Sequence, residues 1–69
     1  MITLSRREDG MWLVVGHGFE AYWSDLDFAA CSALRFADTL GAETPTLAAG
    51  VPADALERGR RMMTLLNAE

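Results

Sequence analysis

His17 is the only histidine of this 69-residue chain, and it stands between Gly16 and Gly18. A catalytic histidine needs an acid that orients it and a nucleophile or substrate within about 3 Å. No serine or cysteine of the sequence lies in a motif that would supply that nucleophile. Glycine on both sides is instead typical of a tight turn between strands, because glycine adopts a positive φ without steric cost. We therefore interpret the three residues as a turn. A small enzyme that uses His17 is the third of three alternative functions.

Three arginines, Arg58, Arg60 and Arg61, form the one basic cluster in a sequence that has no lysine. Such a cluster on a helix could contact the phosphates of DNA. The three side chains would, however, spread over a wide arc of the helix, and the formal net charge of −4 repels phosphate. We interpret the cluster as a solvated helix face whose charge suits the helix dipole. A DNA-binding regulator that uses these arginines is the alternative function.

The middle of the chain is acidic, with seven acids against Arg35 alone from residue 20 to residue 57. Asp25 and Asp27 lie two positions apart at a predicted helix start, so they point in different directions and make a poor acid–base pair. One cysteine, Cys31, and one histidine exclude an internal disulfide and a zinc site built from His and Cys. We expect no catalytic residue, metal or cofactor. The acidic region suits docking on a basic protein partner.

The first third of the chain has the pattern of three strands. Residues 2–6 alternate apolar and polar side chains, residues 11–15 are all apolar, and residues 19–23 alternate again. Asp9-Gly10 between the first two segments is a strong hairpin signal. The sequence therefore predicts an antiparallel meander of three strands.

Two helices are predicted to follow. Ser24 is the expected N-cap of the first helix and Gly41 its stop signal. Residues 44–50 predict one helical turn, and Pro52 opens a second helix with Gly59 in its middle, which indicates close contact with another helix. Phe28 and Cys31 fall outside the predicted core face of the first helix. That core face comprises Leu26, Ala29, Ala30, Ala33, Leu34, Phe36, Ala37 and Leu40.

The second face of the predicted sheet is apolar, because alternation places Met11, Leu13 and Val15 on it together with Tyr22. The first helix covers one side of a sheet, so either the second helix or another chain must cover this one. A chain this short with 51% hydrophobic residues favours a homodimer or a protein partner. The expected partner-binding residues are Met11, Leu13, Val15, Tyr22, Asp25, Asp27 and Phe28.

The sequence thus predicts a single α+β domain over residues 1–69 with the order β-β-β-α-α. On the Asp9-Gly10 turn, the apolar strand at 11–15 and the Ala-rich helix after Ser24, this order resembles the small antitoxins of the HicB type, whose sheet and helix neutralise a toxin. Small acidic phage inhibitors have similar size and charge. The resulting hypothesis is a non-catalytic protein that binds and regulates or inhibits a protein partner. No apolar run approaches the roughly 20 residues that span a bilayer, and a single cysteine suits the cytoplasm.

Overall fold

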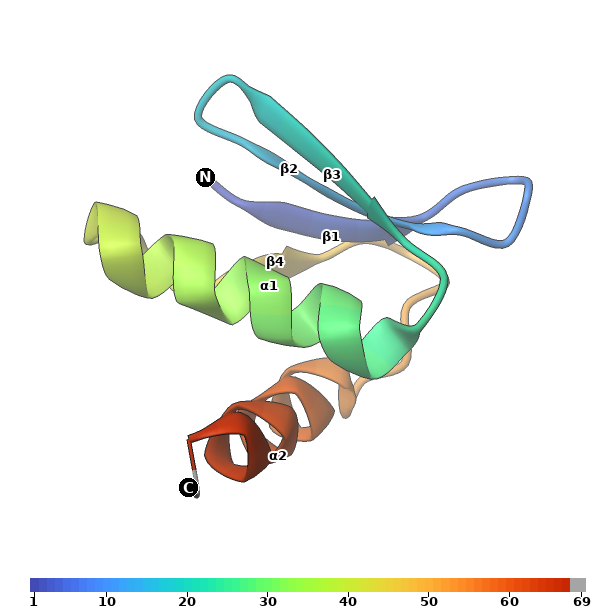
Figure 1. Ribbon diagram of the computed structural model, residues 1–69. Coiled ribbons are helices and arrows are strands. Elements are labelled where there is room, and N and C mark those ends of the chain that lie inside the picture. The colour runs from blue at the N-terminus through green and yellow to red at the C-terminus, as the bar shows by residue number, and fades with distance from the viewer. Residues whose placement is uncertain (68–69) are drawn as a thin grey trace.

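The computed structural model describes residues 1–67 and has an α+β fold, as the sequence predicts. Figure 1 shows one sheet with two helices on the same side of it. The strand order across the sheet is β3-β2-β1-β4, in which the first three strands of the chain form the predicted antiparallel meander and β4 runs parallel to β1. The elements are β1 (Thr3–Arg6), β2 (Trp12–Gly16), β3 (Phe19–Trp23), α1 (Leu26–Leu40), β4 (Thr46–Leu47) and α2 (Ala55–Leu66).

Two tight turns connect the strands of the meander. Gly10, with a φ of 89°, lies in the turn between β1 and β2. His17 and Gly18, with φ values of 50° and 82°, form the turn between β2 and β3, and the flanking Gly16 and Phe19 face each other. Positive φ at both central residues is what a type I′ turn requires, and the twist of that turn matches the twist of the strands. The structure thus confirms that Gly16-His17-Gly18 is a turn.

The prediction of a helical turn at residues 44–50 is wrong, because this segment contains β4. The backbone N–H of Thr46 donates to the carbonyl of Ile2 at 2.8 Å, and the N–H of Ala48 donates to the carbonyl of Leu4 at 2.9 Å. These bonds satisfy the edge of β1 that β2 leaves unpaired. Pro45 is compatible with a first helical position and also with an extended chain, so the pairing with β1 decides the outcome.

The ends of α1 are set by Asp25 and Gly41. The N-cap is Asp25, whose carboxylate accepts a hydrogen bond from the N–H of Phe28 at 3.1 Å, so the assignment of the cap to Ser24 is wrong by one residue. Aspartate and serine are comparable caps, and here the carboxylate of Asp25 reaches the third N–H of the helix. The predicted stop at Gly41 is confirmed, with the glycine in the left-handed conformation at a φ of 65°.

Replacing Asp25 by alanine is expected to lower the free energy of unfolding by about 0.5–2 kcal/mol, because the N–H of Phe28 then loses its acceptor. The matched S24A variant removes a side chain that does not cap the helix and is expected to change stability by less than about 0.5 kcal/mol. Urea denaturation followed by circular dichroism measures both values. A larger loss in S24A than in D25A would restore Ser24 as the cap.

The alanines of α1, which belong to the predicted core face, bring its backbone close to the sheet. Ala29, Ala33 and Ala37 are buried together with Leu26 in one core cluster with side chains of the sheet, and Ala30 is buried where α1 meets α2. The fully buried side chains on the sheet side are Leu4 of β1, Val14 of β2 and Ile2, which directly precedes β1.

Three side chains of α1 depart from the predicted core face. Phe36 and Leu40 are 36% and 48% exposed, because they lie at the margin of the contact with the sheet. Cys31, predicted to lie off the core, is 3% exposed. The second helix covers that side of α1. A helical projection of α1 alone shows only the residues of α1, so it does not reveal that another helix buries Cys31.

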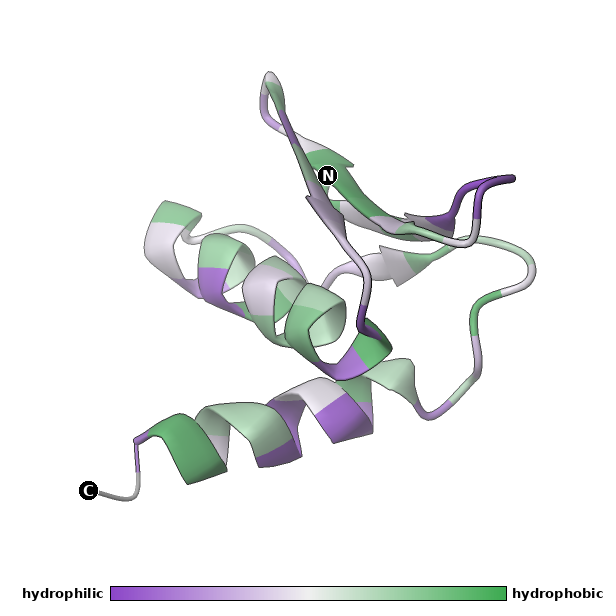
Figure 2. Cartoon of the chain, turned by 45° about the vertical axis from the view of Figure 1, so that its right-hand side comes forward, coloured by the Kyte–Doolittle hydropathy of each residue, from purple (hydrophilic) through white to green (hydrophobic). Residues whose placement is uncertain are grey.

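α2 packs against α1 on the side away from the sheet (Figure 1), and Figure 2 shows the same three layers after rotation. It begins at Ala55 behind the N-cap Asp54, three residues after the predicted opening at Pro52. Gly59 is buried where the helices meet: a Cβ there would lie 2.7 Å from the backbone carbon of Ala30. The close contact predicted for Gly59 is therefore with α1, and the second face of the sheet is covered by neither helix. No helix within residues 1–67 has the length and apolar character to span a bilayer.

Candidate functional site

The uncovered side of the sheet carries Leu13, Val15 and Tyr22, and we call it the open sheet face. Leu13 stands opposite Tyr22 in the strand register, next to it on the same face. Leu13 is half-buried by its neighbours, whereas Val15 is 36% and Tyr22 46% exposed. The polar residues on the same face are Thr3, Ser5 and Glu20. The face therefore has an apolar centre with a polar border.

Tyr22 is held between a carboxylate and a guanidinium. Its hydroxyl donates a hydrogen bond to Oε2 of Glu20 at 2.7 Å, and the guanidinium of Arg7 lies 4.6 Å from the centre of its ring. The hydrogen bond to Glu20, together with the negative charge of that carboxylate, raises the pKa of Tyr22 above its usual value, so the phenol stays neutral. Tyrosine and arginine are enriched where proteins bind one another.

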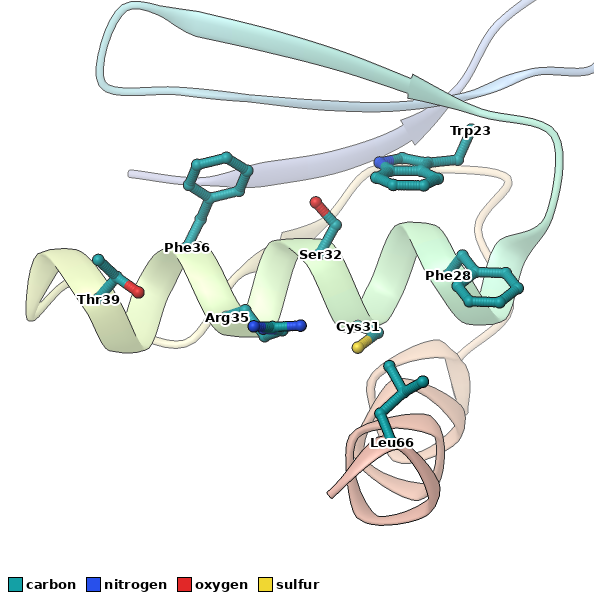
Figure 3. A pocket seen from close by; sticks show the side chains of 8 residues that line it. All are labelled: Trp23, Phe28, Cys31, Ser32, Arg35, Phe36, Thr39 and Leu66. Carbon is teal, nitrogen blue, oxygen red and sulfur yellow. The ribbon is translucent and has the colours of Figure 1, made fainter. Parts of the chain in front are cut away.

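A second surface, the aromatic groove, lies between the β3 edge of the sheet and α1 (Figure 3). It has a volume of about 350 Å³. The ring of Trp23 stacks on Phe28 with 6.3 Å between their centres, and Phe36 stacks on Phe19 at 4.0 Å. The groove is lined by Trp23, Phe28, Cys31, Ser32, Arg35, Phe36, Thr39 and Leu66.

The groove contains two side chains that can act as nucleophiles elsewhere, Cys31 and Ser32, but the setting of each is unreactive. Burial raises the pKa of the Cys31 thiol, an effect that Arg35 only partly opposes, so the thiolate is disfavoured at neutral pH. Ser32 lies on α1, whereas His17 is exposed in the turn between β2 and β3. Within residues 1–67 no group of three His, Cys, Asp or Glu side chains is placed to hold a metal. The groove offers apolar contact.

The predicted partner-binding residues do not form one surface. Leu13, Val15 and Tyr22 come together on the open sheet face, while Met11 is half-buried beside the first turn. Phe28 lies in the aromatic groove, on the other side of the sheet.

The two predicted acids bind within the chain instead of presenting their charge to a partner. Asp25 caps α1, and Asp27 forms an ion pair with Arg58 of α2, with 2.7 Å between Oδ1 and Nε. The N–H groups of Arg58 do not point at that oxygen, so Oδ1 accepts no hydrogen bond among the described residues. The contact is therefore an ion pair of partly exposed groups, which is a modest stabilisation.

The arginine cluster is partly neutralised by the same contacts. Arg58 binds Asp27, and Arg61 binds Glu57 one turn earlier on α2 at 3.0 Å. Only Arg60 of the three lacks an ion pair with another residue in the described part of the chain. A phosphate-binding surface needs positive charge that is not already paired, so this arrangement does not favour the DNA-binding alternative.

The groove residues Trp23, Phe36 and Leu66 were not among the predicted partner-binding residues. Phe36 falls on the predicted core face of the first helix, and the periods place Trp23 and Leu66 among the other apolar residues of their elements. These side chains are exposed because they lie at the margin of the contacts that α1 makes with the sheet and with α2. The periodicity of the sequence does not show where such a contact ends. No protein-family model, no curated protein and no solved structure matches this chain.

Proposed function

We propose that this protein is a non-catalytic interaction protein that binds a protein partner through the open sheet face and thereby regulates or inhibits it. The observation that supports this proposal is the placement of both helices on one side of the sheet. An antiparallel sheet with one solvated face normally carries polar side chains on that face. Here its centre is Leu13, Val15 and Tyr22.

The composition of the open sheet face fits a partner that binds and dissociates. Interfaces of this kind combine an apolar centre with a polar rim and are no more apolar overall than the rest of the surface. Tyr22 lies beside Leu13 on the edge strand β3, and its neighbours Glu20 and Arg7 hold it in one orientation. A fixed aromatic side chain loses little conformational entropy when it binds, so Tyr22 is the expected main contributor to affinity.

Occlusion is the mode of regulation that these residues support. The described residues bring together no nucleophile with a base and no metal-binding group. A protein without such groups changes the activity of its target by covering a surface that the target needs or by stabilising one of its conformations. The expected target presents an apolar patch bordered by basic residues that complement Glu20.

Photo-cross-linking in the source cells tests this proposal. With benzoylphenylalanine in place of Val15, we expect one protein adduct other than the chain's own dimer, and a loss of roughly tenfold in its yield when Y22R is added. The T64R variant, which places the same charge on an exposed residue of α2, is expected to leave the yield unchanged. If position 15 gives no adduct with another protein, or if T64R lowers the yield as much as Y22R, the proposal fails.

A further inference from the structure

Within residues 1–67, β3 forms a free edge of the sheet, because its one neighbour in the strand order is β2. Gly16 and Phe19 flank the two-residue turn, and hydrogen-bonded pairs alternate with non-bonded ones from there. The backbone groups of Phe19, Ala21 and Trp23 therefore face β2, whereas those of Glu20 and Tyr22 point away from the sheet. An edge of this kind is a template for another strand, and β3 carries no proline or lysine that would discourage pairing.

The aromatic groove runs beside this free edge. Of its lining side chains, Trp23 is 37% exposed, Phe28 44% and Leu66 49%. Figure 3 shows Trp23, which ends β3, lying over α1, with Leu66 of α2 below the helix. Large apolar side chains gathered in this way are typical of a surface that another protein covers. The occupant must pair with a strand and fill the groove at the same time.

We infer that this occupant is a second copy of the chain, related by a two-fold axis that passes through the middle of β3. Ala21 is the central residue of the five in this strand. An antiparallel pair centred on Ala21 sets Glu20 opposite the partner's Tyr22, and these are the two positions whose backbone groups point outward. On the groove side, Phe19 comes opposite the partner's Trp23. The edge is thus complementary to itself, as a two-fold interface requires.

Charge complementarity across this pair favours a second copy over an unrelated strand. The guanidinium of Arg7 lies 4.6 Å from the ring centre of Tyr22, on the open sheet face. Because Glu20 comes opposite the partner's Tyr22, its carboxylate comes to the side of that ring, within reach of the partner's Arg7, which also pairs with Asp9 of its own chain at 3.5 Å. The symmetry forms this contact twice, once with each Glu20.

The spacing of the helices explains why the groove is aromatic. α1 lies across β1, β2 and β3, so its axis lies near β2, the middle strand of the three. The two copies of β2 would stand three strand spacings apart, about 14 Å. Helices in direct contact are closer, at about 8–10 Å. Large side chains must fill the difference, and Trp23, Phe28 and Phe36 of both copies are available for it.

The dimer leaves the proposed target-binding face accessible. Pairing through β3 joins the two sheets into one, and the open sheet faces of both copies lie on the same side of it. Obligate interfaces are more apolar than transient ones. The aromatic groove has the composition of an obligate interface, and the open sheet face has that of a transient one. The two proposals share Glu20, Tyr22 and Arg7 at the β3 margin, but they are tested at different positions, Val15 and Ala21, and can fail separately.

A cysteine placed on the two-fold axis tests the register. Residues opposite each other in a non-hydrogen-bonded pair have Cα atoms about 4.5 Å apart, within the range of about 4.4–6.8 Å that a disulfide spans. In a C31A background, A21C is expected to form a disulfide-linked dimer on mild oxidation. T46C, on the exposed opposite edge of the sheet, is expected to remain monomeric under denaturing electrophoresis. If T46C links as readily as A21C, or if A21C does not link, the inference is wrong.

Light scattering over a dilution series gives the second measurement. The wild-type chain is expected at twice its monomer mass of 7.5 kDa, and E20R and R7E are each expected to raise the dissociation constant roughly tenfold or more. Mixing the two variants should restore the dimer, because both contacts across the axis are then attractive. Within each variant chain, positions 7 and 20 carry the same charge and do not attract each other. Recovery of the dimer on mixing therefore reports a contact between chains. A monomeric wild type, or no recovery on mixing, overturns the inference.

Discussion

Replacement of Gly59 by alanine lowers the free energy of unfolding by about 1–3 kcal/mol, although alanine is the better helix former. At an exposed helical position the same change would raise stability by about 1 kcal/mol. Gly59 is buried against α1, and an added Cβ would lie 2.7 Å from the backbone carbon and 2.8 Å from the Cβ of Ala30, and 2.9 Å from the backbone nitrogen of Cys31. Two of these three atoms belong to the backbone of α1, so neither helix can accommodate the methyl group unless they move apart.

The separation of the helices has a consequence for the rest of the molecule. α2 contacts the remainder of the chain mainly through α1, as Figure 2 shows. When α2 is displaced, Cys31 and Ala30 become accessible to water, and the groove loses Leu66 as part of its lining. We therefore expect G59A to increase the rate at which a thiol reagent labels Cys31 in the folded protein.

The measurement is urea denaturation at one fixed protein concentration, because association makes apparent stability depend on concentration. R60A, at an exposed position next to Gly59 on the same helix, serves as the control and is expected to change stability by less than about 0.5 kcal/mol. The double variant A30G/G59A is expected to recover little, since the backbone atoms of α1 remain in place. A gain of about 1 kcal/mol in G59A would show that the helices do not meet at this residue.

Those parts of the fold that depend on neighbouring residues were predictable from the sequence. The turns at Gly10 and Gly18 follow from residues that tolerate positive φ, and the strands between them follow from alternation. Gly41 ends α1 where expected. Gly59 was correctly assigned to a helix contact, because a glycine inside an amphipathic helix needs a packing reason.

The rest depended on contacts between distant segments. The conformation of Thr46 and Leu47 is decided by hydrogen bonds with β1, more than forty residues earlier in the sequence. The position of α2 was undetermined, since its apolar face fits the sheet and α1 equally well by period alone. For the same reason Cys31 was placed outside the core and Trp23 was not recognised as part of a surface. Candidate binding residues were correctly identified on the open sheet face and were incomplete at the groove.

The second large effect is expected from Leu4, and Leu13 provides its matched control. Both are leucines on adjacent strands of the same sheet, but Leu4 is 0% exposed beneath α1, whereas Leu13 lies on the open sheet face. L4A leaves a cavity in the core and is expected to lower the free energy of unfolding by about 2–5 kcal/mol. A domain of this size has a total of roughly 3–10 kcal/mol, so L4A removes a large fraction of it.

L13A is expected to cost less than about 1 kcal/mol, because neither helix packs over this side chain and water already reaches that face. Urea denaturation at equal protein concentrations gives the difference between the two variants. If L4A has no folded baseline, I2V removes one methyl group from another fully buried side chain and is expected to cost about 0.5–1.5 kcal/mol. Equal losses in L4A and L13A would mean that something covers the second face in the isolated protein.

The comparison between these leucines also bears on function. A side chain that contributes little to the stability of its own domain is free to contribute to binding, so L13A should remain folded and lose affinity for the target. A core residue changes both quantities together, because binding then reports only the folded fraction. Loss of the adduct at position 15 in L13A, with unchanged stability and an unchanged dimer, would separate the open sheet face from both the core and the β3 edge.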